Sequence, residues 1–319
     1  MEKLISLLGD GCFHSGEELG ASLGISRAAV WKKIQALAEL GLELDAVRGK
    51  GYRLPSTIEM LDKKAIEKHL SADVRKNVGV ALHLTTPSTN DEVKAQVGNG
   101  ERLQVCIAEH QSAGRGRRGR VWQSPFGASL YYSLLWRVDS GLSTMDGLSL
   151  AVGLVVVKTL ESLGVQGLSL KWPNDILVEN KKLAGVLLEI SGDPMGTCEV
   201  VIGIGINLFL GLEHKKKIDQ PVTDVHTAAG RSVGKNKIAG LLTTNLVAML
   251  DTFQQHGFVP FKNVWQEYDA FAGQWVTLSA GENAITGVAT GVSDSGAVLI
   301  RNDAGITAYA GGEISLRKL

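Results

Sequence analysis

Residues 114–120 alternate glycine with arginine in the order Gly-Arg-Gly-Arg-Arg-Gly-Arg. Glycine lets backbone N–H groups approach a ligand with no Cβ in the way. Each guanidinium is a permanently charged fork that fits phosphate or carboxylate oxygens. The run predicts a loop that closes over an anionic ligand, with Arg115, Gly116, Arg117, Arg118 and Arg120 as its candidate contacts. The alternative, a disordered Arg/Gly segment that binds RNA, is disfavoured because strand-like aliphatic segments flank the run at 103–109 and 130–136.

Polar and aromatic residues that suit a ligand lie on both sides of this loop. Ser88, Thr89 and Asn90 precede a predicted helix. Such residues usually cap a helix, but they also suit hydrogen bonds to a neutral polar ligand, and the sequence leaves both possibilities open. Gln111 precedes the loop by three residues and is expected at the edge of the pocket. Trp122 follows the loop and offers a flat surface for a base or an apolar chain.

Two adjoining segments add a candidate cation and a candidate carboxylate. In Lys171-Trp172-Pro173-Asn174-Asp175, the proline interrupts a strand ladder, so we expect a turn that exposes Asn174 and Asp175. Gly185 lies inside a predicted strand, which indicates close approach by a ligand or another backbone. Lys182 then lies near that approach. The alternative is a hairpin with a solvated lysine tip.

A second strand, 202–207, has Gly203 and Gly205 on one face and Asn207 at its end. The glycines leave room for a ligand, and the amide suits an adenine edge, although glycine pairs also occur for packing alone. The sequence has neither a dinucleotide-binding Gly-x-Gly-x-x-Gly fingerprint nor a Walker lysine motif.

The first 54 residues predict a winged helix-turn-helix. Helices are expected at 4–8, 15–23 and 26–40, followed by a two-stranded ribbon at 42–54. Basic residues gather on the third helix and the ribbon, as a helix in the major groove and a wing on the phosphates require. The candidate DNA contacts are Ser26, Arg27, Trp31, Lys32, Arg48 and Lys50. A three-helix protein-interaction module is the alternative.

The remaining elements predict an α+β protein of three domains. A linker is expected at 55–57, then a helix at 58–70 and a mixed sheet with long helices at 145–164 and 237–256. Alternation from 271 to 316 predicts a small β-barrel. The predicted domains are 1–56 (winged helix-turn-helix), 57–270 (mixed-sheet ligand-binding domain) and 271–319 (β-barrel).

Composition excludes several classes of protein. Lys+Arg and Asp+Glu number 33 each, so any attraction to nucleic acid must be local. Cys12, Cys106 and Cys198 are scattered without metal-ligand spacing, which fits reduced thiols in a cytoplasmic protein. We find no secretory signal, and the most apolar run, 148–157, is shorter than the roughly 20 residues of a membrane span. We therefore expect no membrane partner and no zinc site.

In combination and order, these motifs resemble the biotin–protein ligases. The matching segments are Gln111-x-x-Gly114-Arg115-Gly116-Arg117-x-Gly119-Arg120-x-Trp122, Lys171-Trp172-Pro173-Asn174-Asp175, Lys182-Leu183-Ala184-Gly185, Gly203-x-Gly205-Ile206-Asn207 and Gly311-Gly312-Glu313-Ile314-Ser315-Leu316-Arg317. With the winged helix in front, the whole chain is similar to the bifunctional type, which is both a ligase and a biotin-operon repressor. Pro87 departs from the aspartate that many members have there.

The resemblance implies an ATP-dependent ligase that forms biotinyl-5′-adenylate and transfers biotin to a lysine of a carrier domain. It implies that Ser88, Thr89, Asn90, Gln111, Gly116, Gly185, Gly203 and the Arg115 backbone surround biotin, and that Lys182 neutralises its carboxylate. Arg117, Arg118 and Arg120 would organise the phosphates, Trp122, Asn174 and Asn207 would hold the adenylate, and Arg317 would face the ATP site or remain a surface arginine. Asp175 would orient Mg²⁺ or the incoming amine. The C-terminal domain is expected to be SH3-like.

The implied partners are the biotin carboxyl carrier protein domain of acetyl-CoA carboxylase, operator DNA, and a second copy of the chain when adenylate is bound. A loop at 211–224 is expected to order with the adenylate and to couple it to dimerisation. Two other functions are considered: a lipoate–protein ligase, and a biotin-sensing repressor without ligase activity.

Overall fold

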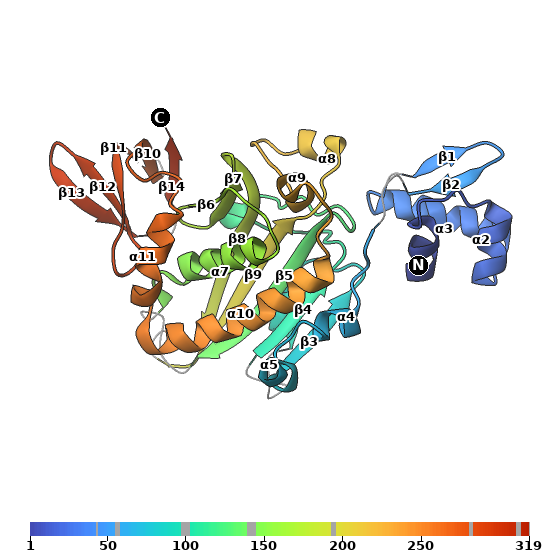
Figure 1. Cartoon of the computed structure of the whole chain (residues 1–319), viewed down its shortest axis with the longest axis horizontal. Coiled ribbons are helices and arrows are strands. Elements are labelled where there is room, and N and C mark those ends of the chain that lie inside the picture. Colours follow the sequence, from blue (N-terminus) through green and yellow to red (C-terminus); the bar gives the residue numbers. More distant parts are fainter. Residues whose placement is uncertain are drawn as a thin grey trace.

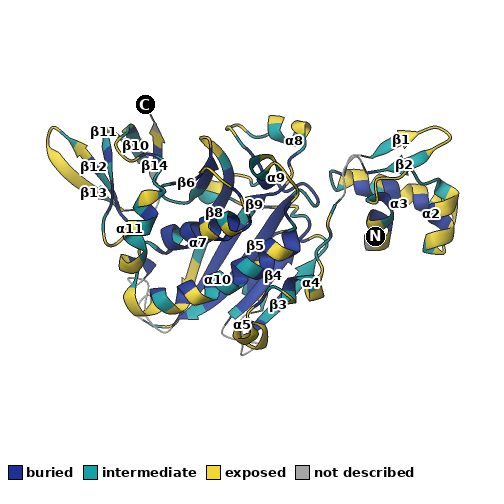
Figure 2. Ribbon diagram, in the orientation of Figure 1, coloured by how far each residue is buried: buried dark blue, intermediate teal, exposed yellow. Residues whose placement is uncertain are grey.

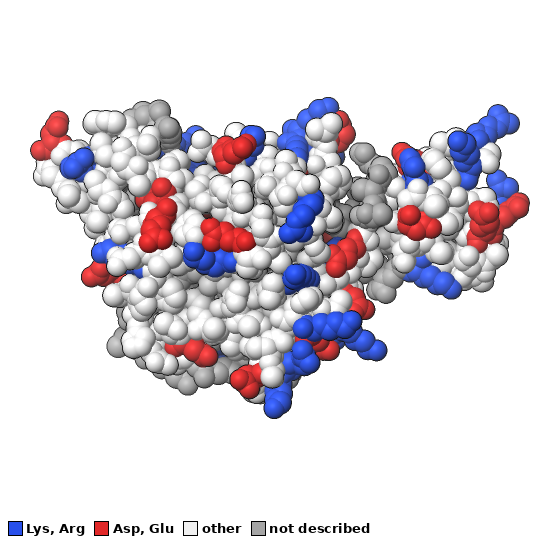
Figure 3. Space-filling model, in the orientation of Figure 1, with Lys and Arg blue, Asp and Glu red and all other residues white. Residues whose placement is uncertain are grey.

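The computed structural model describes residues 1–42, 44–54, 58–96, 103–138, 145–192, 196–280, 283–310 and 314–318. The N-terminal and C-terminal domains lie at opposite ends of a larger central domain (Figure 1). Cationic and anionic side chains are interspersed on the face shown in Figure 3, as the balanced composition requires. None of the helices in the described ranges is long and apolar enough to cross a membrane.

The N-terminal domain contains helices α1 (Glu2–Leu8), α2 (Gly16–Leu23) and α3 (Arg27–Glu39) and the hairpin β1 (Asp45–Val47) and β2 (Gly51–Arg53). Ser15 and Glu18 form a capping box that starts α2. Gly24 ends the helix at φ +68°, a conformation that favours glycine. The Ser26 hydroxyl then accepts a hydrogen bond from Ala29 N and starts α3. The predicted helix–turn–helix–wing order is confirmed.

The central domain is a seven-stranded mixed sheet in the order β3-β4-β5-β9-β8-β7-β6. Only the β3–β4 pair is parallel. The strands are β3 (Val78–His83), β4 (Leu103–Ala108), β5 (Ser129–Val138), β6 (Leu168–Lys171), β7 (Asp175–Val178), β8 (Lys181–Gly192) and β9 (Cys198–Asn207).

Two long helices, α7 (Leu148–Ser162) and α10 (Lys235–His256), cover one face of this sheet (Figures 1 and 2). Strand β5 shows how the faces differ. Leu134 and Trp136 point into the main core beneath these helices. Leu135 points to the other face, where it packs with Val93 of α6 (Thr89–Ala95). That second face is left partly open, and the pocket described below lies there.

The helix expected at 58–70 is the main error in the predicted elements. Two short helices occur instead, α4 (Lys63–Glu67) and α5 (Ala72–Asn77). Tertiary hydrogen bonds hold the preceding segment: Leu61 N donates to Glu109 Oε1, and Asp62 N donates to Asn236 Oδ1. Those bonds compete with helical ones, and the Asp62 side chain caps the helix that follows. The expected linker at 55–57 lies outside the described residues.

The connections of the central domain contain three short helices, η1 (Arg117–Gly119), α8 (Leu212–Lys216) and α9 (Val225–Ala229). Helix α11 (Val259–Glu267) leads to the C-terminal domain. That domain is a five-stranded antiparallel sheet in the order β13-β12-β11-β10-β14. Its strands are β10 (Trp275–Ala280), β11 (Asn283–Val292), β12 (Val298–Asn302), β13 (Gly305–Tyr309) and β14 (Ile314–Lys318). Residues 311–313 of the predicted closing motif lie outside the described ranges.

Candidate functional site

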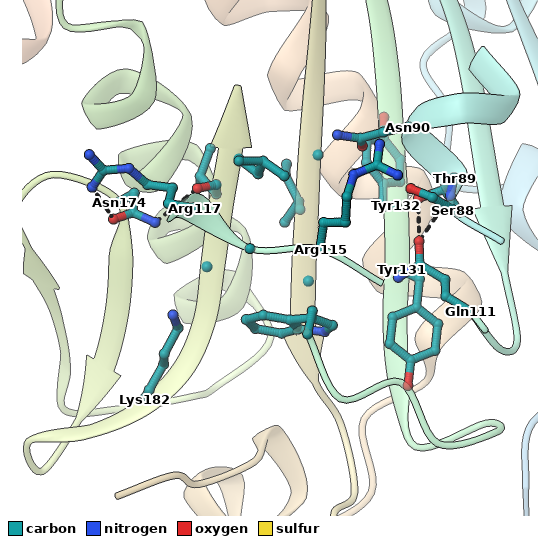
Figure 4. Close-up of a pocket in the computed structure, with 18 residues that line it drawn as sticks. Ser88, Thr89, Asn90, Gln111, Arg115, Arg117, Tyr131, Tyr132, Asn174 and Lys182 are labelled. Atoms are coloured by element: carbon teal, nitrogen blue, oxygen red, sulfur yellow. Dashed lines mark hydrogen bonds between the residues drawn. The ribbon is translucent and has the colours of Figure 1, made fainter. Parts of the chain in front are cut away.

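The open face of the central sheet carries a pocket that collects most of the predicted ligand residues (Figure 4). Its free volume is about 60 Å³, room for about two water molecules. It is lined by Ser88, Thr89, Asn90, Gln111, Arg115, Gly116, Arg117, Trp122, Tyr131, Tyr132, Asn174, Lys182, Gly185, Val186, Leu187, Gly203, Ile204 and Gly205. These residues come from the start of α6, the glycine–arginine loop and the residues that flank it, the turn between β6 and β7, and strands β5, β8 and β9.

One end of the pocket is a cluster of neutral hydrogen-bonding groups. Gln111 Oε1 accepts from Thr89 N at 2.9 Å and from Thr89 Oγ1 at 3.1 Å (Figure 4). Ser133 Oγ lies 2.7 Å from Thr89 Oγ1 and 2.5 Å from Asn90 Oδ1. Ser88 occupies the N-cap position of α6, but its side chain makes no cap hydrogen bond. Ser88 lines the pocket, so the capping alternative does not hold for its side chain, and binding to a ligand stays a prediction.

The pocket floor is made of glycines because side chains lie directly on it. A Cβ at Gly203 would be 2.5 Å from Asn90 Oδ1, and one at Gly205 would be 2.5 Å from the Trp122 ring. A Cβ at Gly185 would be 3.2 Å from both the Trp122 ring and Lys182 Nζ. The close approach predicted at Gly185 is therefore made by two side chains of this chain, rather than by a neighbouring backbone.

Lys182 and Asp175 form an ion pair at the centre of the site. Lys182 Nζ is 2.7 Å from Asp175 Oδ1, and the two side chains are 15% and 16% exposed. The prediction that the Pro173 turn exposes Asp175 is wrong, because Asp175 begins β7 opposite Lys171 and Gly185 and is held between neighbouring strands. Lys182 Nζ also lies 5.3 Å from the centre of the Trp122 ring.

Asn174 is half-buried and is likewise not exposed as predicted. Its Nδ2 donates to the Val186 carbonyl at 3.0 Å, and its Oδ1 accepts from Arg117 Nη1 at 3.1 Å (Figure 4). Arg117 is thereby fixed against the turn that follows β6. Burial lowers the pKa of Arg117, and Arg118 and Arg120 lower it further while Asp175 raises it.

A half-buried lysine, Lys171, joins this group of cations. Burial lowers its pKa, and the nearby charges of Lys182, Arg317 and Arg120 act in the same direction. Among the described residues, Asp175 is the carboxylate that raises the pKa of both Arg117 and Lys171. Arg118, Arg120 and Arg317 are exposed and do not line the pocket, but Arg120 and Arg317 lie within electrostatic range of it. The arrangement leaves an excess of positive charge, which suits a polyanion.

Asn207 lies behind the pocket instead of in it. The side chain is 4% exposed. Its Nδ2 donates to the Thr223 carbonyl at 3.1 Å and to the Lys182 carbonyl at 3.4 Å. The expectation that this amide contacts adenine therefore finds no support in this structure, because both donors hold the backbone that carries Lys182.

In the N-terminal domain, the predicted DNA contacts lie on exposed parts of α3 and the hairpin. Trp31 is 55% exposed, and Arg27, Lys32, Arg48 and Lys50 are also exposed. Arg27 lies 3.8 Å from Glu17 in an exposed ion pair. The Ser26 hydroxyl is already used as the cap of α3, so a contact from Ser26 to a phosphate would compete with that cap.

Comparison with known proteins agrees with this arrangement over the whole chain. The chain is 41% identical to the bifunctional ligase/repressor BirA of Escherichia coli, covering 99% of this chain and 96% of that protein. The chain belongs to the biotin protein ligases of the bifunctional ligase/repressor type. Family models match at 1–53 (HTH domain), 82–207 (biotin/lipoate A/B protein ligase family) and 271–317 (biotin protein ligase C-terminal domain).

Other members of the family support the same conclusion. The chain is 33% identical to the biotin–[acetyl-CoA-carboxylase] ligase of Paracoccus denitrificans, over 69% of this chain and 93% of that protein. The biotin protein ligase from Aquifex aeolicus, solved in complex with biotin and ATP, is 29% identical with a TM-score of 0.65. The match covers 76% of this chain and 99% of the Aquifex aeolicus chain.

Sequence reasoning missed several residues of the site. Ser133, inside a strand, hydrogen-bonds Thr89, and Ser124, in a loop, accepts a hydrogen bond from Gln111. In the sequence, Tyr131 and Tyr132 look like ordinary core residues, and both are buried. Lys171 belongs to the segment 171–175, but the sequence indicates no role for it. No single-residue pattern identifies these residues, and only the pairing of β5 with β9 places Ser133 opposite Gly203 and Tyr131 opposite Gly205. In the described part of the chain, no cluster of three His, Cys, Asp or Glu side chains could hold a metal ion.

Proposed function

We propose that the chain joins biotin to ATP as biotinyl-5′-adenylate and transfers the biotinyl group to a lysine of a biotin carboxyl carrier protein domain. One observation carries the proposal: Lys182 lies on a glycine floor between a neutral hydrogen-bonding cluster and a group of excess cations. The neutral end suits a cyclic urea, and the cationic end suits a triphosphate. An ammonium between them is where a carboxylate and an α-phosphate must meet.

Each set of residues then has a role in the reaction. Thr89, Gln111 and Asn90 orient the urea ring, and Ser88, Gly116, Gly185 and Gly203 shape its pocket. Lys182 offsets the repulsion between the carboxylate and the α-phosphate and then the charge that develops as pyrophosphate leaves. Arg117, Arg118, Arg120, Lys171 and Arg317 neutralise the phosphates. Holding both reactants in line supplies much of the remaining rate.

Asp175 has a positioning role in this proposal. Its carboxylate, 2.7 Å from Lys182 Nζ, fixes the ammonium toward the floor. Mg²⁺ is expected to arrive on the nucleotide phosphates and to add charge neutralisation, since the described residues offer no three-ligand protein site for it. Trp122 is expected to move from the floor and stack on the adenine, because its ring lies directly over Gly205 and Gly185.

The repressor half of the proposal is that α3 and the wing bind operator DNA as a homodimer when adenylate is bound. The link between ligand and DNA is supported by contacts at both ends of the ligand loop. Before the loop, Glu109 accepts from Leu61 N in the segment that follows the DNA-binding domain. After it, Phe126 belongs to the hydrophobic core of that domain. We therefore expect a movement of the loop to change these two contacts with the N-terminal domain and the segment that follows it.

The segment 211–224 is the second proposed link. Its helix α8 is held by an ion pair of 2.8 Å between Lys215 and the buried Asp224, and its end pairs with Lys182 through Val222. Trypsin cleavage at Lys215–Lys217 should fall when biotin and ATP are added together. Cleavage that is unchanged by the ligands would separate this segment from the ligand site. Both DNA binding and the three free thiols fit a cytoplasmic protein.

The direct test is transfer of biotin to a purified carrier domain, followed by its mass. With ATP and biotin the carrier should gain one biotinyl group, and with lipoate in place of biotin it should gain nothing. Lys182→Gln should lower adenylate formation at least a hundredfold (roughly 2.7 kcal/mol), whereas Lys181→Gln, on an exposed neighbour, should not. A chain that binds biotin tightly yet never forms adenylate would instead be a sensor without ligase activity.

The repressor test is binding to the promoter region of a biotin-synthesis operon, measured with and without biotin and ATP. Binding should need both ligands and should weaken when Lys50 is changed to Gln, with a smaller dependence on salt. Equal binding with and without ligands would remove the regulatory half of the proposal and leave the ligase half intact.

A further inference from the structure

The side chain of Arg115 bonds to acids outside the expected phosphate site. Its Nη1 and Nη2 donate to the two carboxylate oxygens of Asp91, both at 2.7 Å, in a parallel fork. Nη2 also donates to Glu189 Oε1 at 3.3 Å. The other oxygen of Glu189 accepts from Lys94 Nζ at 2.5 Å. A loop residue is thus joined to helix α6 and strand β8 through one charged network.

This network differs from an ordinary surface ion pair. The side chains are partly covered, with Arg115 38%, Asp91 49% and Glu189 24% exposed. Isolated surface pairs contribute little, but a bidentate Arg–carboxylate pair within a network is the recognised exception. The Arg115 hydrogen bonds lower the pKa of Asp91. For Glu189, burial raises the pKa, but Lys94 and Arg115 outweigh it and the net pKa is lowered.

The network lies where the pocket must open. Gly114 O accepts from Trp122 N and Gly116 N donates to Arg120 O, so 114–122 forms a small closed lobe. One side of this lobe is tied to Asn174 by Arg117 (Figure 4), and the other is tied to α6 by the bond from Arg115 to Asp91. Asp91 directly follows Asn90 in α6. Arg115, Gly116 and Arg117 line the pocket from this side, so we expect the lobe to move when a reactant enters or leaves.

We infer that Asp91 and Glu189 act with Arg115 as an electrostatic latch that holds the glycine–arginine loop closed and sets how long the activated intermediate stays bound. The inference rests on the proposed ligase activity. Asp91 and Glu189 touch neither reactant and are positioning residues. The arginines of the loop then have different roles. Arg115 forms ion pairs with carboxylates of the protein, whereas Arg117, Arg118 and Arg120 are proposed to neutralise the phosphates.

The test measures release of adenylate made from radiolabelled biotin, after gel filtration and a chase with unlabelled biotin. Asp91→Asn should speed release about tenfold, which corresponds to about 1.4 kcal/mol, while the rate of adenylate formation at saturating substrate stays within about twofold. Glu189→Gln should have a smaller effect, because it leaves the bidentate pair in place. Arg115→Lys keeps the charge but loses the fork, and it should fall between the wild type and Asp91→Asn.

The matched control is Asp294→Asn, which breaks another 2.7 Å ion pair, with Lys262, in the C-terminal domain. It should release adenylate at the wild-type rate. Added salt should speed release more from the wild type than from Asp91→Asn, because only the wild type has the bidentate Arg115–Asp91 pair to screen. Trypsin cleavage at the exposed Arg118 should rise in Asp91→Asn at unchanged urea stability.

The possible failures can be told apart. A wild type that makes no adenylate would defeat the proposed activity itself. Asp91→Asn that makes adenylate, and releases it at the wild-type rate at low salt, would overturn the latch. If Asp91→Asn does not fold, Arg115→Lys with unchanged release and unchanged cleavage would do the same.

Discussion

The buried ion pair between Lys235 and Glu109 gives the sharpest stability prediction. The two side chains are only 4% and 2% exposed, and Glu109 also accepts the Leu61 backbone hydrogen bond. Glu109→Gln keeps an acceptor for Leu61 but leaves the Lys235 ammonium without a counter-charge. Breaking one partner of a buried pair costs about 3–5 kcal/mol. In a domain of this size that cost corresponds to about 6–20 °C in Tm.

The double variant Glu109→Gln with Lys235→Met separates charge from packing. It removes both charges and keeps the Leu61 hydrogen bond, so the free energy of unfolding should return to within about 1 kcal/mol of the wild type. Glu213→Gln breaks the exposed 2.7 Å pair with Lys216 and should cost less than about 1 kcal/mol.

Urea unfolding followed by tryptophan fluorescence suits this measurement, because four of the six tryptophans, Trp122, Trp136, Trp172 and Trp265, belong to the central domain. The reasoning would be refuted if Glu109→Gln lowered the free energy of unfolding no more than Glu213→Gln does. The Lys235–Glu109 pair would then be screened by water and not buried in protein.

Three further predictions follow from the site and its surroundings. Gly205→Ala should slow adenylate formation at least tenfold, because its Cβ, which would lie 2.5 Å from the present position of the Trp122 ring, would fill the floor on which the reactants are proposed to lie. Initial rates of pyrophosphate release measure this. The latch carboxylates have lowered pKa values, so their pairing is complete above the ordinary carboxyl pKa and is lost as the pH falls through the folded values. The ratio of release rates between Asp91→Asn and the wild type should therefore be flat from about pH 5 to 8 and should begin to fall toward one only below about pH 4, as the pH passes through the lowered pKa values. Finally, an alkylating reagent at neutral pH should label one thiol of the native chain, Cys12, and three after unfolding, because burial raises the pKa of Cys106 to about 12 and Cys198 is also buried.

The sequence predicted most of what local patterns control. The capped helices of the N-terminal domain, the alternating strands and the ligand motifs depend on residues close together in the chain. For this reason the fold class followed from local patterns, and Thr89, Gln111, Lys182 and Gly203, which the motifs and the resemblance to the biotin–protein ligases predicted, line one pocket. The helix expected at 58–70 failed because Glu109 and Asn236, both distant in sequence, take the hydrogen bonds of its first turn.

Only the tertiary structure decided what each polar group faces. Asn207 has the right type and position for a nucleotide contact, yet the neighbouring strand and the 222–224 segment use both of its donors. Arg115 is one of four arginines in the loop, and only the folded positions of Asp91 and Glu189 separate its task from theirs. The sequence determines which groups are available and which elements carry them. Their partners are set by long-range packing, because a hydrogen bond or an ion pair forms only between atoms that the fold has already brought within about 3 Å.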